Sequence, residues 1–172
     1  MQLIAEKQFL DQIQQIRDRI FRVSKRILIS KEEAEDATQE VILKLWTMDK
    51  EQLNSCKSIE AYSLTMTKNY CLDRLKSKQA QVTTLNEELS HRPANSLQQQ
   101  LEIGDQLRWV THLIDQLPEK ERMIIQLREI EQFEYDQIAT ILNIPEGTVR
   151  VYLSRIRKKL KKQFLKIQSH GS

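Results

Sequence analysis

The side chains best suited to chemistry are the cations near the C-terminus. No acidic residue follows Glu146, but eight basic residues do: Arg150, Arg155, Arg157, Lys158, Lys159, Lys161, Lys162 and Lys166. Charge of one sign along a single segment favours the binding of phosphates, as in a nucleic acid. Taken alone, the same run also fits a solvated basic tail.

Residue types that support catalysis or metal binding are scattered. The three histidines are His91, His112 and His170, and the cysteines Cys56 and Cys71 form no CxxC pair. No nucleophile elbow or phosphate-binding loop occurs in the sequence. We therefore expect no enzyme, no catalytic site, no metal, no cofactor and no small-molecule substrate. Two separated cysteines indicate a reduced, cytoplasmic compartment.

The composition favours an all-α protein. Three glycines and three prolines are too few for the many turns of a sandwich or barrel. No run of about 18 apolar residues occurs, so we do not expect a membrane-inserted protein.

Hydrophobic periodicity fails between Ser77 and Gly104, where Gln, Ser, Asn and Thr dominate. This composition is typical of a linker. We therefore predict two small helical domains, residues 1–78 and 105–168, joined by a flexible linker over residues 79–104.

The C-terminal domain has the pattern of a helix-turn-helix. A helix is predicted from Pro118 to about Glu131, a short one over 135–142, and a third one after Pro145. Asn143 suits the tight turn between the last two, because Asn tolerates the left-handed conformation.

The third helix has a buried side and an exposed side. Val149, Leu153, Ile156 and Leu160 step by four, three and four residues and form one apolar stripe. The opposite face and its flanks have small, hydrogen-bonding or basic residues, as in a recognition helix for the major groove. The DNA-reading residues predicted there are Thr148, Arg150, Val151, Ser154, Arg155 and Lys158.

In the first domain, Ser30 and Glu33 have capping-box spacing and predict the start of a helix. Ala34, Ala37, Val41 and Leu45 form its apolar side. The opposite side includes Asp36, Gln39, Glu40 and Leu43. A leucine among acidic and polar residues suggests a partner surface, although isolated exposed leucines are also common.

A helix predicted over 59–78 is apolar on two sides and should be packed between neighbours. Its polar strips include Lys68, Asn69, Asp73 and Arg74. Its tyrosines, Tyr62 and Tyr70, either stack on unpaired bases or belong to the core.

Three stretches resemble one family. The C-terminal part of the chain contains LPEKERMIIQLREIEQFEYDQIATILNIPEGTVRVYLSRIRKKLKK. This stretch resembles the promoter-binding C-terminal domain of the extracytoplasmic-function (ECF) sigma factors, which belong to the RNA polymerase sigma-70 family. Two signature stretches of their N-terminal domain are similar to EEAEDATQEVILKLW and SIEAYSLTMTKNYCLDRLKSK. The similarity follows the family's order, but Asn143 stands where Gly is usual and Tyr62 where Trp is usual.

This resemblance implies a sigma factor that binds core RNA polymerase and directs promoter recognition, strand opening and transcription initiation. It implies that the acidic face of the first domain docks on the clamp helices of the largest polymerase subunit. The residues of this face are Asp36, Gln39, Glu40 and Leu43. The resemblance assigns the melted downstream element to Lys68, Asn69, Asp73 and Arg74, with the loop 47–57. It implies that the third C-terminal helix reads the upstream element and that the linker passes through the polymerase channel. It also implies an anti-sigma factor as a further partner.

The main alternative is a helix-turn-helix regulator that binds promoter DNA without polymerase, with its N-terminal half as a sensing or dimerising domain. A purely structural helical adaptor is a weaker alternative. Association with core polymerase separates the first alternative from a sigma factor.

Overall fold

The computed structural model describes residues 2–85 and 106–170, and every element assigned in these two stretches is helical. In chain order they are α1 (Gln2–Leu28), α2 (Lys31–Trp46), α3 (Lys50–Ser55), α4 (Ile59–Leu85), α5 (Gln106–Asp115), α6 (Glu119–Ile125), the π-helix η1 (Gln126–Ile130), α7 (Tyr135–Leu142) and α8 (Glu146–His170). The predicted all-α fold is confirmed. Most of the predicted flexible linker lies outside the described residues.

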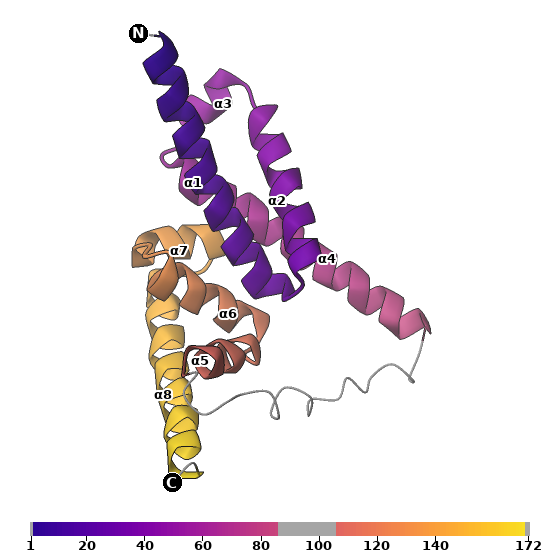
Figure 1. The fold of residues 1–172 in the computed structure, drawn as a ribbon, viewed down its shortest axis with the longest axis vertical. Coiled ribbons are helices and arrows are strands. Elements are labelled where there is room, and N and C mark those ends of the chain that lie inside the picture. Colours follow the sequence, from indigo (N-terminus) through magenta and orange to yellow (C-terminus); the bar gives the residue numbers. More distant parts are fainter. Residues whose placement is uncertain (1, 86–105, 171–172) are drawn as a thin grey trace.

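The N-terminal half is built on three long helices. α1 packs against α2 and α4, and α2 also packs against α4 (Figure 1). The helices pack closely because α2 contributes the small buried side chains Ala34 and Ala37 beside Val41. The predicted apolar side of α2 is therefore confirmed. The facing core residues are Ile20, Val23 and Ile27 of α1 and Leu64 and Cys71 of α4.

The start of α2 shows the first of the two hydrogen bonds of the predicted capping box, in which the Ser30 side chain caps the helix. The Ser30 hydroxyl accepts a hydrogen bond from the Glu33 backbone N–H at 3.4 Å, which satisfies one free donor of the first turn. The Glu33 carboxylate forms an ion pair with Lys78 of α4. This side chain thus joins two helices.

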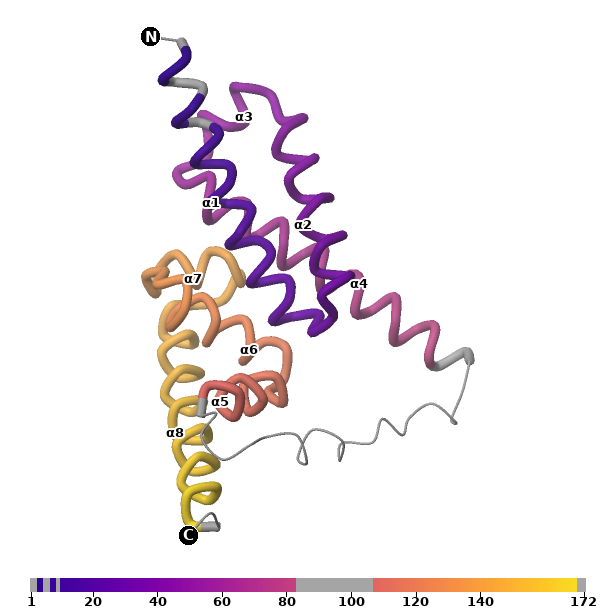
Figure 2. Tube along the Cα trace, in the orientation of Figure 1, coloured from indigo at the N-terminus to yellow at the C-terminus, as the bar shows by residue number. Residues whose placement is uncertain are grey.

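α4 is the central helix, as predicted, because it contacts α1, α2 and α7. It is longer than predicted and continues past Lys78 to Leu85. Its last turns project away from the bundle (Figures 1 and 2). Directly after Lys78 come Gln79, Ala80 and Gln81, whose backbone preference favours continuation of the helix.

The C-terminal half contains the predicted helix-turn-helix. α7 has the predicted bounds, and Asn143 adopts the left-handed conformation (φ 55°, ψ 50°) between α7 and α8. Val149, Leu153 and Ile156 are buried and Leu160 is partly buried, which confirms the stripe on α8. The buried residues that face it include Ile124, Leu127, Ile138 and Ile141.

The helix before this motif differs from the prediction in its last turn. Instead of continuing as an α-helix to Glu131, the chain forms the π-helix η1. The Glu131 backbone N–H donates to the Gln126 carbonyl at 3.0 Å, a five-residue spacing. This spacing aligns the two side chains, and the Gln126 amide donates to the Glu131 carboxylate at 3.2 Å.

The two halves are in contact. α1 packs on α6 and η1, and α4 packs on α7. Figures 1 and 2 show the halves side by side, with the beginning of α1 and the end of α8 at opposite ends of the molecule. None of the helices in the described residues is both long and apolar enough to cross a membrane.

Ile29 also adopts a left-handed conformation (φ 66°), directly after α1. This conformation costs a β-branched residue more than it costs Asn. We expect Ile29→Gly to raise the free energy of unfolding by roughly 0.5–1 kcal/mol, and Asn143→Gly to raise it by less. Urea titrations of both variants test this, and an equal or larger gain from Asn143→Gly would contradict the expectation.

Candidate nucleic-acid interface

The first turns of α8 form an exposed face because the apolar stripe fixes the opposite side of the helix in the core. Arg150, Val151, Ser154, Arg155 and Lys158 are all exposed, while Thr148 is half-buried. Val151 is 49% exposed in the middle of this polar face. An exposed methyl group at this place suits contact with the methyl group of thymine in the major groove.

Two arginines of α8 are engaged with the protein. Arg150 donates to the Glu146 carboxylate at 2.9 Å, and its guanidinium lies 4.5 Å from the centre of the Tyr135 ring. This contact fixes Arg150 at the corner between α7 and α8. Arg157 donates from Nε to Glu129 at 2.9 Å, and this hydrogen bond raises the pKa of Arg157. We infer that Arg157 fastens α8 to η1, whereas Arg155 and Lys158 face solvent.

The predicted partner surface on α2, called the α2 face from here on, is exposed at each of its four residues. Asp36, Gln39, Glu40 and Leu43 all face solvent, and Leu43 is 62% exposed. Gln39 and Leu43 line a groove together with Arg17, Ile42 and Trp46. Arg17 comes from α1, so the periodicity of α2 gave no signal for it.

The four predicted residues of α4 do not share one face. Asn69 and Asp73 are exposed one turn apart, on the side that also carries Tyr62, which is 40% exposed. Lys68 lies on one flank, half-buried, and burial lowers its pKa. Arg74 lies on the other flank, where it pairs with Asp36 of α2 at 3.8 Å and donates to the Tyr70 hydroxyl at 3.2 Å.

The Asp36–Arg74 pair therefore joins the two predicted surfaces of the N-terminal half. Asp36 belongs to the α2 face and Arg74 to the α4 set. Both side chains are well exposed, so the pair contributes little to stability. A change at Asp36 also changes the surroundings of Arg74.

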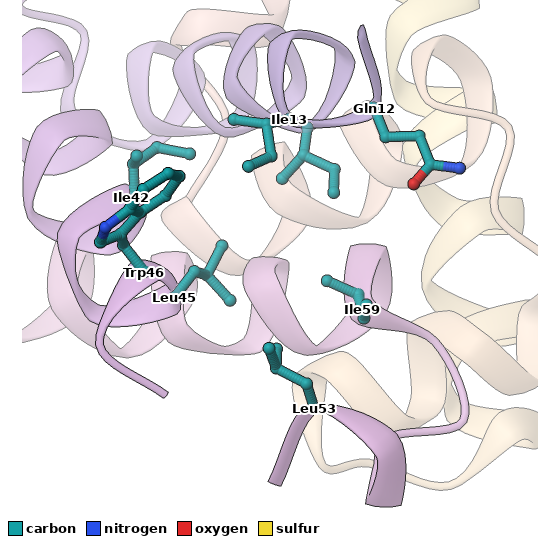
Figure 3. A pocket seen from close by; sticks show the side chains of 8 residues that line it. Gln12, Ile13, Ile42, Leu45, Trp46, Leu53 and Ile59 are labelled. Atoms are coloured by element: carbon teal, nitrogen blue, oxygen red, sulfur yellow. The ribbon is translucent and has the colours of Figure 1, made fainter. Parts of the chain in front are cut away.

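An apolar pocket lies under α3. Side chains from α1, α2, α3 and the start of α4 converge on it (Figure 3), among them Ile13, Ile42, Trp46, Leu53 and Ile59. α3 has no buried residue, and Leu53 is half-buried. The segment 47–57, predicted as a loop, contains the short helix α3, and it is held over the pocket by few apolar contacts.

Two family models match the chain in the order expected from its motifs. Sigma-70 region 2 matches residues 12–81 and sigma-70 region 4 matches residues 107–160. The chain belongs to the ECF sigma factors of the sigma-70 family. This sigma factor works with RNA polymerase in transcription initiation.

Relatives of known role cover the chain to different extents. The ECF RNA polymerase sigma factor SigW of Bacillus subtilis (strain 168) is 28% identical over 167 residues, which cover 90% of this chain and 88% of SigW. The ECF RNA polymerase sigma-E factor of Escherichia coli (strain K12) is 41% identical over 59 residues, 34% of this chain and 31% of that protein.

A solved structure shares the fold of this sigma factor. It is the sigma factor RpoE from Bartonella quintana in complex with the anti-sigma factor NepR. The TM-score is 0.70 at 20% sequence identity, and the match covers 94% of this chain and 98% of that chain.

Proposed function

We propose that the N-terminal half binds core RNA polymerase through the α2 face and contacts the melted downstream promoter element through α4 and the loop 47–57. The C-terminal half reads the upstream element with α8. In this proposal residues 1–78 and 105–168 are the functional domains, and residues 79–104 connect them through the polymerase channel. The chain supplies recognition and strand opening, while the chemistry of RNA synthesis belongs to the polymerase, so the sigma factor itself is not an enzyme.

The presence of two different exposed surfaces on one chain supports this proposal most directly. The α2 face combines acids with the exposed Leu43, and the α8 face is basic. An exposed apolar residue within a polar rim suits a protein partner, whereas the basic face suits phosphates. A regulator that binds DNA by itself needs only the second surface.

Two further expectations follow from this role. A factor that acts on the bacterial chromosome with RNA polymerase works in the cytoplasm.

The Bartonella quintana sigma factor with the same fold was solved with an anti-sigma factor bound, so we propose that a partner of this kind controls the present chain.

In vitro transcription tests the proposed function. Purified sigma factor is added to core polymerase and a genomic promoter library, and the start sites of the transcripts are sequenced. We expect a defined set of start sites with shared upstream and downstream elements. Failure to initiate, with binding to duplex DNA retained, would favour a regulator that acts without polymerase.

Lys68 and Asn69 are expected to affect strand opening more than initial duplex binding. Specific contact with single bases needs bases that are already out of the stack. On a linear duplex promoter, Lys68→Ala and Asn69→Ala should slow open-complex formation, and a pre-melted template should restore most of the rate. Lys76→Ala, an exposed change on the same helix, serves as the control. Equal losses on both templates would contradict a role in melting.

A further inference from the structure

An apolar pocket lies where the core of the N-terminal half ends. It has a volume of about 280 Å³, and side chains from four helices point toward its centre (Figure 3). They include Ile13 of α1, Ile42, Leu45 and Trp46 of α2, Leu53 of α3 and Ile59 of α4. All six are half-buried or exposed, so each keeps apolar surface that another molecule can cover.

The pocket exists because α1 and α2 pack closely at one end only. Near their junction, Ala34 and Ala37 of α2 are fully buried. From there the two helices diverge toward α3 (Figures 1 and 2). Ile42 and Leu45, further along α2, are only half-buried. Their side chains line the gap between the helices without filling it.

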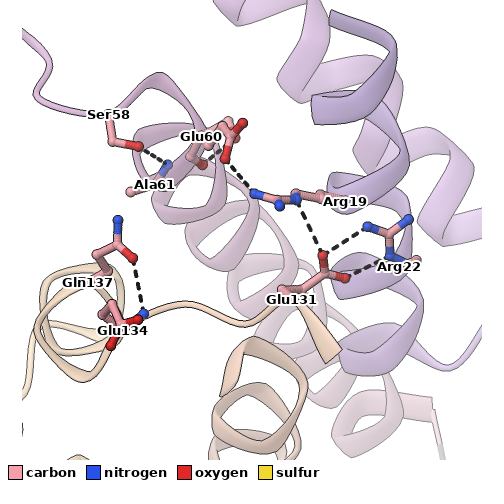
Figure 4. Close-up of polar contacts among 9 residues, drawn as sticks. Arg19, Arg22, Ser58, Glu60, Ala61, Glu131, Glu134 and Gln137 are labelled. Atoms are coloured by element: carbon pink, nitrogen blue, oxygen red, sulfur yellow. Dashed lines mark hydrogen bonds and ion pairs between the residues drawn. The ribbon is translucent and has the colours of Figure 1, made fainter. Parts of the chain in front are cut away.

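The wall formed by α1 and α4 is held by polar contacts. The Ser58 hydroxyl caps α4 by accepting a hydrogen bond from the Ala61 N–H at 3.2 Å. Glu60 of α4 pairs with Arg19 of α1 (Figure 4). These contacts fix Ile59 relative to α1, because Ile59 lies between the capping residue and the ion pair.

A buried carboxylate fastens α1 to the C-terminal half. Glu131, directly after η1, has a side chain that is 1% exposed. Arg22 of α1 binds it with two parallel hydrogen bonds, from Nε to Oε1 at 2.8 Å and from Nη2 to Oε2 at 2.9 Å (Figure 4). Bidentate pairs of this kind are among the stronger polar interactions in proteins. We therefore expect α1 and α4 to keep their places whether the pocket is empty or filled.

α3 is held much more weakly than the other walls. It spans six residues, and within the described part of the chain none of them is buried and Asp49 forms no side-chain cap at its start. A helix this short does not persist in water without tertiary contacts. Leu53 is half-buried and supplies the contact of α3 with the pocket. What fills the pocket therefore determines how firmly the segment 47–57 is held.

The wall determines which molecules fit. Among the described residues its polar groups are the Gln12 amide and the indole N–H of Trp46, and it has no charged side chain. Burial of a charge without a partner is costly, so charged ligands are excluded. A dry cavity of about 150 Å³ binds benzene, and a volume of about 280 Å³ accordingly suits two fused rings or a branched chain of about ten carbons.

We propose that the pocket binds a small, uncharged, largely apolar molecule, whose packing on Leu53 fastens the segment 47–57. An unpaired base of the promoter is a poorer occupant, because a flipped base is recognised through hydrogen bonds along its edge and the wall has few groups for them. The effect on promoter opening rests on the proposed function, in which the segment 47–57 contacts the melted downstream element.

Binding of 2-naphthol tests the site, because this probe has two fused rings, one hydroxyl group and no charge at neutral pH. The isoleucine methyl groups are labelled with ¹³C and followed by NMR during the titration. We expect saturable shifts at Ile13, Ile42 and Ile59, with a dissociation constant on the order of 0.1–1 mM. Ile138 and Ile156, which are buried in the C-terminal half, should not shift.

The matched ligand control is 2-naphthoate, which has the same rings and a negative charge. It should bind at least about tenfold more weakly than 2-naphthol. Equal binding of the two probes, or no saturable shift with 2-naphthol, would overturn the site. Displacement of 2-naphthol by a single-stranded downstream-element oligonucleotide would make a base the occupant and overturn the proposed ligand class.

Variants that alter the pocket should alter binding. Ile13→Phe fills part of the space and should weaken 2-naphthol binding at least about tenfold. Leu10→Phe, an exposed change on the same helix outside the wall, should leave binding unchanged. Leu53→Ala removes the contact with α3 and leaves the buried core intact, so it should weaken binding roughly fivefold. Circular dichroism checks the helices, and parental affinity in both pocket variants would contradict the proposal.

Amide hydrogen exchange tests whether the occupant fastens α3. The Leu53 N–H donates to the Asp49 carbonyl at 3.0 Å, and its exchange requires this helix to open. If opening needs an empty pocket, exchange slows by one plus the ratio of free ligand to its dissociation constant, about fivefold at a ratio of about four. The Ile144 N–H, bonded to the Ala139 carbonyl at 3.0 Å in the C-terminal half, is the control. Unchanged exchange at Leu53 with 2-naphthol bound would overturn the fastening of α3.

Open-complex formation connects the site to the proposed function. At the same 2-naphthol concentration, its rate with core polymerase and a duplex promoter should change for the parent and for Leu10→Phe, but not for Ile13→Phe. Binding and slower exchange without such a change would confirm the site and overturn the role proposed for the segment 47–57 at the downstream element.

Discussion

Association with core polymerase is expected to be lost, by at least about a hundredfold, when Asp36→Arg is combined with Gln39→Ala. Both residues are exposed on the α2 face. Like charges brought together across an interface cost several kcal/mol, and about 2.7 kcal/mol corresponds to a hundredfold. Titration of labelled core polymerase with the variant measures the loss, and circular dichroism checks that the helices are intact.

The Asp36–Arg74 ion pair complicates this test, because the same change places a cation beside Arg74. Arg74→Ala therefore accompanies the double variant, and we expect it to retain polymerase binding. Glu35→Arg is the matched charge control, since Glu35 is an exposed neighbour outside the predicted face. A double variant that initiates at the parental rate would remove the α2 face from consideration.

Arg155→Ala and Lys161→Ala are expected to fail in different ways, although both residues are exposed cations of α8. Arg155 lies opposite the buried stripe, where we propose that its guanidinium reaches the acceptor edge of a guanine. Lys161 lies beyond Leu160, where we expect it to meet phosphate only. Loss of the base contact lowers the free energy of binding by about 1–3 kcal/mol and relaxes the preference at one base pair. Loss of the phosphate contact weakens binding to all sequences alike and lowers the slope of log affinity against log salt concentration by roughly one.

The comparison requires upstream-element variants measured at several salt concentrations. Arg157→Ala is an informative third variant, since Arg157 is bound to Glu129 and its loss should affect stability more than base preference. The orientation of α8 on DNA would be reversed if Lys161→Ala changed base preference while Arg155→Ala lowered affinity uniformly.

Local patterns predicted the parts of the fold that depend on neighbouring residues. The bounds of α7, the left-handed Asn143 and the stripe of α8 follow from turn chemistry and helical periodicity, which act over one or two turns. The exposed α2 face was predicted for the same reason, since the buried alanines determine what the opposite side presents.

The parts that depend on distant residues were not predictable. Arg22 and Glu131 are 109 residues apart and each looks like an ordinary surface charge in its own segment. Arg17 joins the groove beside Leu43 only because α1 packs on α2. The extra length of α4 could not be predicted from periodicity, because residues 76–82 are all exposed and form no apolar stripe.

The π-helix η1 makes the contact between the halves depend on chain length at one place. A five-residue hydrogen bond in an otherwise α-helical segment amounts to one inserted residue. Deleting a residue from 126–130 would restore regular α-helical spacing and turn Glu131 by about 100° away from Arg22. During evolution, a single codon lost or gained here would break or form the Arg22–Glu131 pair, while the Arg26–Asp115 ion pair and the packing of α4 on α7 would remain.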